Sequence, residues 1–132
     1  MQKSKDLLFQ LESIVKTNGI LNFEVLNFLE NVFSKKSDKV METIKRGISK
    51  VVCTPTGRII WIANGKEVNH IIYPKLYCSC QDFYKNVVIK RENPFCKHIL
   101  AQVISEALED FKTDYCEEKD LEDLIEKIES NF

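Results

Sequence analysis

The first third of the chain carries apolar residues at helical spacing. A second helix is expected over Phe23–Phe33, where apolar positions cover more than one narrow stripe. Such a helix is either central to the core or partly a surface for a partner. Ser37-Asp38 is expected to cap a short third helix. The first helix is indicated by a periodic apolar run closed by Asn18-Gly19, and the run consists of Leu7, Leu8, Leu11, Ile14 and Val15.

The pattern changes from helical to extended near residue 47. Turn chemistry at Thr54-Pro55-Thr56-Gly57 and at Asn64-Gly65 separates three runs rich in β-branched residues. These runs predict a three-stranded antiparallel meander, with strands over Ile48–Cys53, Arg58–Ala63 and Val68–Tyr73. Trp61 is expected to pack in this sheet, with a stacking platform for bases as the alternative. His70 lacks a neighbour at metal-ligand spacing along the chain and is interpreted as structural.

The residues that follow the meander carry the chemistry of this sequence. Cys78 and Cys80 form a C-x-C pair, and after fifteen residues Cys96 and His98 form a C-x-H pair. In an extended segment, residues two apart project to the same side, so both cysteines of the first pair can reach one ion. Three sulfurs and one imidazole complete a tetrahedral shell, which is typical of a structural zinc site.

A long amphipathic helix is expected to carry the second pair in its first turn. Pro94 precedes this helix, as is common at a helix start. The positive end of the helix dipole favours the thiolate form of a cysteine in the first turn. The apolar positions that predict this helix are Ile99, Leu100, Val103, Ile104, Ala107, Leu108 and Phe111.

Two other interpretations of the cysteines compete with zinc. Free cysteine is a common core residue, so the four residues could be unrelated and buried. A Cys–His nucleophilic enzyme is the second alternative, but a dyad leaves two cysteines unexplained. We therefore expect one structural zinc ion and no enzymatic activity. Cys53 and Cys116 lie outside the two pairs and are interpreted as spectators.

Composition and length favour one domain. The chain has 132 residues, of which 44% are hydrophobic and 30% charged, and its four glycines form no phosphate-binding loop. No apolar run is long enough for a membrane span, and the N-terminus lacks a secretory signal. We expect a soluble intracellular protein, in the cytoplasm of an archaeal cell or the nucleus of a eukaryotic one.

Charge divides the chain into a basic body and an acidic tail. Residues 1–104 hold 16 Lys and Arg against nine Asp and Glu, a net of +7, and residues 105–132 hold three against 11, a net of −8. A modest excess of this kind predicts weak DNA binding by the chain alone. The candidate DNA contacts are Lys45, Arg46 and Lys50 before the hairpin and Lys85, Lys90, Arg91 and Lys97 around the zinc loop.

The cysteine and histidine pattern resembles the SWIM zinc finger, which is defined by C-x-C, a variable spacer and C-x-H. The alanine three residues after the histidine, Ala101, resembles the extended form found in the small SWIM subunit of Shu-type recombination complexes. The resemblance covers roughly residues 20–130. It implies a heteromeric complex with a RecA-family recombinase paralogue, and a role in assembling recombinase filaments on single-stranded DNA. Ala101 would let the helix sit close to the metal loop.

Two other function classes stay open. One is a stand-alone zinc module that binds DNA, and the other is an interaction adaptor that never touches nucleic acid. DNA affinity of the isolated chain favours the first, whereas DNA affinity only with a partner favours the recombination role.

These expectations combine into one α+β domain over residues 1–132. It would consist of N-terminal helices (1–46), a meander with the zinc site (47–104), and an acidic helical tail (105–132). The helix Phe23–Phe33 and the C-terminal helix are the candidate partner surfaces, and the residues proposed for contact are Phe23, Phe28, Leu121 and Leu124.

Overall fold

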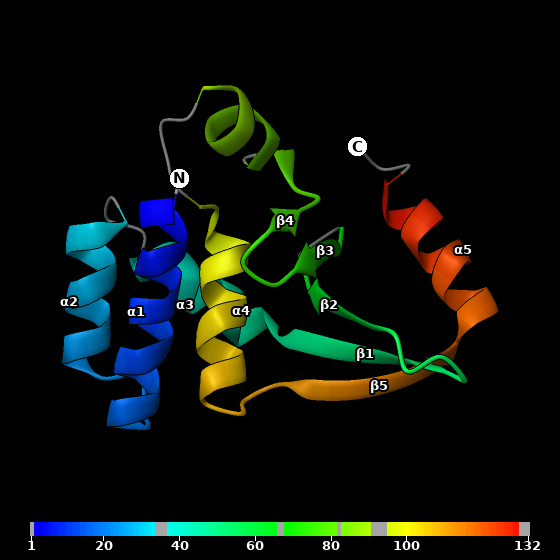
Figure 1. The fold of residues 1–132 in the computed structure, drawn as a ribbon, viewed down its shortest axis with the longest axis horizontal. Helices are drawn as coiled ribbons and strands as arrows, with labels where there is room; N and C mark the ends of the chain where they lie inside the picture. Colours follow the sequence, from blue (N-terminus) through cyan, green and yellow to red (C-terminus); the bar gives the residue numbers. More distant parts are fainter. Residues whose placement is uncertain (1, 34–36, 66–67, 82, 91–94, 130–132) are drawn as a thin grey trace.

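The computed structural model describes residues 2–33, 37–65, 68–81, 83–90 and 95–129 (Figure 1). Its helices are α1 (Gln2–Asn18), α2 (Phe23–Val32), α3 (Ser37–Arg46), the short π-helix η1 (Phe83–Ile89), α4 (Lys97–Ala107) and α5 (Glu118–Glu129). Its strands are β1 (Ile48–Thr54), β2 (Ile59–Ala63), β3 (His70–Tyr73), β4 (Tyr77–Cys78) and β5 (Lys112–Glu117). The predicted α+β class is confirmed. No helix among the described residues is long and apolar enough to cross a membrane.

The N-terminal helices begin and end where local chemistry favours it. Gly19 follows α1 with φ +70°, a backbone conformation that glycine adopts without strain. Its N–H donates to the carbonyl of Val15 at 2.8 Å, which closes the last turn of α1. The side chain of Asn22 caps α2 by accepting from the N–H of Val25 at 3.2 Å.

The five strands form one mixed sheet in the order β4-β3-β2-β1-β5. The predicted meander is β1-β2-β3, in which Lys50 pairs with Trp61 and Trp61 pairs with Ile72. The third strand begins at His70, two residues later than predicted. Trp61 is buried in the sheet as expected, and its ring stacks on Phe111 at 4.9 Å.

Helices cover both faces of this sheet. Along β2, Trp61 and Ala63 contribute to one core, whereas Ile60 and Ile62 contribute to the other. The zinc-side core joins the sheet to the four helices α1 to α4, and the α5-side core joins it to Leu121 and Ile128 of α5. These two groups of helices lie on opposite sides of the sheet (Figure 1). Burial on two faces explains why the sequence of β2 is continuously apolar instead of alternating.

The C-terminal part differs from the helical tail expected over residues 105–132. The helix α4 ends at Ala107, and β5 lies parallel to β1 before α5 begins. The residues of β5 are mostly polar and exposed, so the alternation that predicts a strand is absent from its sequence. Its pairing with β1 therefore depends on tertiary contact.

Candidate metal centre

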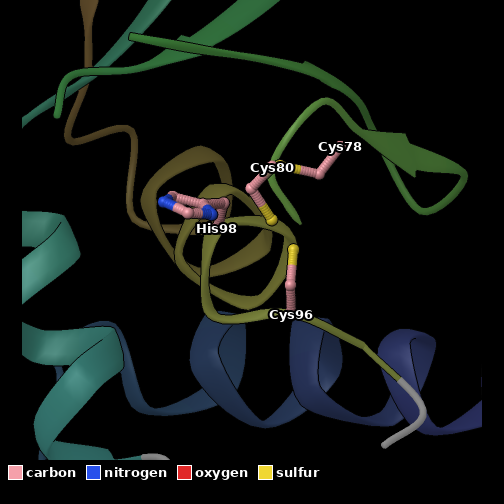
Figure 2. Close-up of side chains that lie close together, drawn as sticks. All are labelled: Cys78, Cys80, Cys96 and His98. Atoms are coloured by element: carbon pink, nitrogen blue, oxygen red, sulfur yellow. The ribbon is translucent and has the colours of Figure 1, made fainter. Parts of the chain in front are cut away.

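The four residues singled out by spacing meet at the junction of the sheet and α4. Cys78 ends β4, Cys80 follows it, Cys96 is the residue before α4, and His98 lies in the first turn of α4. All four are buried, and one ligand atom from each lies within 4.8 Å of the others. Figure 2 shows the sulfurs of Cys80 and Cys96 pointing toward one another beside the ring of His98.

Ser79, the middle residue of the C-x-C pair, fixes this segment to β3. Its N–H donates to the carbonyl of Ile71 at 3.0 Å, and its hydroxyl oxygen accepts from the N–H of Ile71 at 2.9 Å. Ser79 is buried, so neither bond competes with water. Because neighbouring residues of an extended segment point to opposite sides, this clamp directs Cys78 and Cys80 away from β3 and toward one site.

The start of α4 holds the other pair. Cys96 has an extended backbone (φ −81°, ψ 164°) at the N-cap position, and its carbonyl accepts from the N–H of Leu100 at 3.3 Å. The positive end of the helix dipole therefore lies beside the cysteine sulfurs, where it stabilises negative charge. Ala101 is fully buried on the same helix.

The donors fit a tetrahedral zinc ion. With Zn–S bonds of about 2.3 Å, the edges of such a tetrahedron are about 3.8 Å, so small side-chain movements close the shell. Nδ1 of His98 is buried and has no hydrogen-bond partner among the described residues. A buried nitrogen without a partner is costly, and a metal ion at the site removes that cost if this atom is the ligand.

The electrostatics of the cluster also favour binding of a cation. Hydrogen bonds from Cys78 and then Cys96 hold the pKa of the Cys80 thiol far below its usual range. The hydrogen bond to Cys80 raises the pKa of Cys78, and burial raises the pKa of Cys96 to about 12. A divalent ion is needed for all three sulfurs to ionise in this buried place.

Three known proteins are similar to this chain over most of its length. They are zinc finger SWIM domain-containing protein 7 of Mus musculus (25% identical over 123 residues, 92% of this chain and 81% of the relative) and of Homo sapiens (22% over 123 residues, 92% and 88%), and the homolog of Dictyostelium discoideum (28% over 118 residues, 87% and 75%). No protein-family model matches the sequence, and no solved structure matches it significantly.

These relatives and the four-residue cluster support a SWIM zinc-finger family. The side chains of Cys78, Cys80, Cys96 and His98 fit one structural zinc ion, as predicted. At the metal centre, the backbone N–H of Phe83 also donates to a ligand, and its nitrogen lies 3.3 Å from the sulfur of Cys80. Such a hydrogen bond stabilises a metal-bound thiolate. The π-helix η1, which begins at Phe83, therefore contributes a hydrogen-bond donor to the site as well as connecting the two ligand pairs.

One neighbour of the metal centre could not be predicted from the sequence. His70 lies on β3, and its ring centre is 4.6 Å from that of His98. Burial is the main cause that lowers the pKa of His70. Sequence spacing gave no signal for this contact, because it depends on how β3 passes over α4.

The candidate DNA contacts lie on different elements. Lys45 and Arg46 end α3, and Arg46 pairs with Glu42 at 2.7 Å. The ammonium of Lys50, on β1, lies 5.9 Å from the ring centres of both Trp61 and Phe111. Around the zinc loop, Lys85 and Lys90 are exposed and Lys97 is half-buried, whereas Arg91 lies outside the described residues.

The candidate partner residues are not equally available. Phe23 is 82% exposed at the start of α2, whereas Phe28 is half-buried and packs edge-on against Phe33. Leu121 is fully buried in the α5-side core, and Leu124 packs against the same core. The expectation that Leu121 faces a partner is therefore corrected, because Leu121 packs against the sheet in the α5-side core.

Proposed function

We propose that this chain is an accessory protein of homologous recombination. It binds a RecA-family recombinase paralogue and promotes assembly of recombinase filaments on single-stranded DNA. The observation that carries the proposal is the SWIM pattern ending in Ala101, which lies fully buried on the helix that holds His98. Similarity to SWIM proteins over 92% of the chain supports it, because the N-terminal helices are included along with the zinc site.

In this proposal the chain has no catalytic activity of its own. Four protein donors complete the zinc shell and leave no position for a reacting water. The partner supplies ATP hydrolysis. The complex would act on the chromosome, in the cytoplasm of an archaeal cell or the nucleus of a eukaryotic one.

The start of α2 is the proposed partner surface. Phe23 is 82% exposed, and Ile20 just before it is 62% exposed. Large apolar side chains that are exposed to solvent are typical anchors of protein–protein interfaces. Phe28 contributes to the zinc-side core, so Phe23 is the better probe of this surface.

Affinity purification of the tagged full-length chain from its native cell tests the proposal. We expect a RecA-family chain to co-purify with the wild type and with Tyr115→Asp, which changes a side chain of similar exposure (74%) on β5. Phe23→Asp should lose the partner while keeping zinc. Retention of the partner by Phe23→Asp argues against this surface, and absence of any recombinase with the wild type argues against the function.

Within the complex, the basic residues are proposed to contact single-stranded DNA. Each phosphate contact adds about 0.7 to the slope of log affinity against log salt on single strands. Reversing the charge of both Lys85 and Lys90 should therefore lower that slope by about 1.4, as measured by fluorescence anisotropy. Reversing the charge of Lys45 tests the basic cluster before the hairpin. An unchanged slope in both variants would show that this chain is a scaffold that does not contact DNA.

The same measurement separates the two alternatives. Salt-dependent affinity of the isolated chain would favour a stand-alone DNA-binding module. No affinity with or without the partner would favour an interaction adaptor.

A further inference from the structure

The two cysteines outside the metal centre meet in the sheet. Cys53 on β1 and Cys116 on β5 are direct partners in the parallel register, although 63 positions separate them in sequence. Their sulfur atoms lie 3.1 Å apart. Both are free thiols, and both pack at the α5-side core, apart from the zinc ligands of the zinc-side core.

The parallel register of β1 and β5 is compatible with a disulfide between the two residues. Neighbouring strands lie about 4.8 Å apart, inside the range of about 4.4–6.8 Å between Cα atoms that disulfides span. Direct partners in a register project to the same face, so both sulfurs lie on one side of the sheet. The sulfurs need to approach by about 1 Å to reach the bond length of about 2.05 Å, which side-chain rotation supplies.

The two thiols differ in a way that suits an ordered reaction. Cys53 is fully buried, whereas Cys116 is partly exposed on the edge strand. Burial, with the hydrogen bond to Cys116 as a second cause, raises the pKa of Cys53 to about 11. Cys116 is therefore the sulfur that a reagent from solvent meets first, and Cys53 is placed to attack it afterwards.

We propose that Cys53 and Cys116 form a reversible oxidation site, which closes to a disulfide on reaction with a hydroperoxide. The Cys116 thiolate attacks one peroxide oxygen of hydrogen peroxide, the O–O bond breaks, and the second oxygen leaves as hydroxide and is protonated to water. The sulfur of Cys53 then attacks the resulting sulfenic acid, displaces hydroxide, and gives up its proton to form a second water. Two thiols and one peroxide become one disulfide and two waters, so the sulfurs lose two electrons and the peroxide gains them. Two equivalents of a small thiol reduce the disulfide back to the two cysteine thiols and are themselves oxidised to a disulfide.

The disulfide would attach the C-terminal strand and helix to the middle of the fold. It closes a loop between positions 63 apart that contains all four zinc ligands. Loops of this length restrict the unfolded chain strongly, and we expect the melting temperature of the zinc-loaded protein to rise by about 10 °C. Because the zinc cysteines are bound and buried, the metal should stay in place.

Treatment of the zinc-loaded full chain with one equivalent of hydrogen peroxide tests the site. We expect the denatured, metal-free thiol count to fall from the five cysteines of the sequence to three, with an intramolecular cross-link between the peptides that contain Cys53 and Cys116. Zinc content should be unchanged. A small thiol such as reduced glutathione should restore all five.

Two matched variants keep the result interpretable. Cys53→Ala should bind zinc normally and leave Cys116 trapped as a sulfenic acid that dimedone labels. Cys116→Ala should show neither the label nor the rise in melting temperature. The proposal is overturned if peroxide first removes zinc and oxidises Cys78, Cys80 or Cys96, or if Cys116 forms only disulfides between two chains.

Discussion

The zinc-side core and the α5-side core hold the same sheet by different means. On the zinc side, α4 packs against the sheet and the N-terminal helices pack around α4, and four buried donors suited to a metal ion connect β4 to the start of α4. On the other side, one helix and the parallel pairing of β5 with β1 cover the sheet, and the sulfur pair there is a hydrogen-bonded contact between two thiols. The two sets of cysteines therefore differ in what they contribute. One set is expected to be essential for folding, and the other is available for chemistry in a protein that is already folded.

The largest effect should follow from removing a metal ligand. Metal-coupled folding is worth about 10–16 kcal/mol in small zinc domains, which is comparable to the whole stability of a domain. Cys96→Ser should lose zinc by elemental analysis and lose its cooperative melting transition. Cys116→Ser is the matched control on the other core, and it should keep both. Full zinc content in Cys96→Ser would show that the four-donor assignment is wrong.

Truncation of the α5-side core should come next in size. Leu121 is fully buried against the sheet, and Leu→Ala changes at such positions cost about 2–5 kcal/mol. Leu121→Ala should lower the free energy of unfolding in urea by that amount and still bind one zinc ion. Leu76→Ala, at a side chain that is 63% exposed, should change stability by less than about 0.5 kcal/mol. If Leu121→Ala also lost its zinc, the stability of the metal centre would depend on the α5-side core, and the two cores would not be independent.

The clamp at Ser79 should have an intermediate effect confined to the zinc side. Ser79→Ala leaves the N–H of Ile71 without the hydroxyl acceptor that it contacts at 2.9 Å. An unpaired buried donor costs about 1–3 kcal/mol. Zinc affinity should fall in a competition titration with a chelator, because the C-x-C segment is held less firmly. Ser13→Ala, on the exposed side of α1, should leave that affinity unchanged.

The smallest effect concerns an ion pair between the N-terminal helix and the sheet. The Lys75 ammonium donates to a Glu12 carboxylate oxygen at 2.9 Å, and this hydrogen bond lowers the pKa of Glu12 below 4.5. A carboxyl with a lowered folded pKa stabilises the fold above its unfolded pKa, and the contribution is lost as pH falls through the folded pKa. Glu12→Gln should therefore lower the free energy of unfolding by about 0.5–1 kcal/mol at pH 7. The difference from wild type should shrink below pH 4.5, and a difference that grows in acid would contradict this assignment.

Local patterns in the sequence predicted the N-terminal helices, the meander and the zinc ligands. Helical periodicity and the stop at Asn18-Gly19 defined α1, and the β-branched runs with turn residues between them defined β1 to β3. The ligands could be predicted because the residues of each pair are two apart, on an extended segment and at a helix start. In each case the signal and the structure lie within a few residues of one another.

Tertiary structure alone decided the features that join distant segments. The strand β5 carries no alternation and exists because β1 offers it an unpaired edge, and this pairing brings Cys53 and Cys116 together. The same holds for the contact of His70 with His98 and for the burial of Leu121, which depend on how α4 and α5 pack on the two faces of the sheet. Spacing along the chain fixes which residues share a face, but the register between strands and the packing of helices on a sheet fix which faces meet.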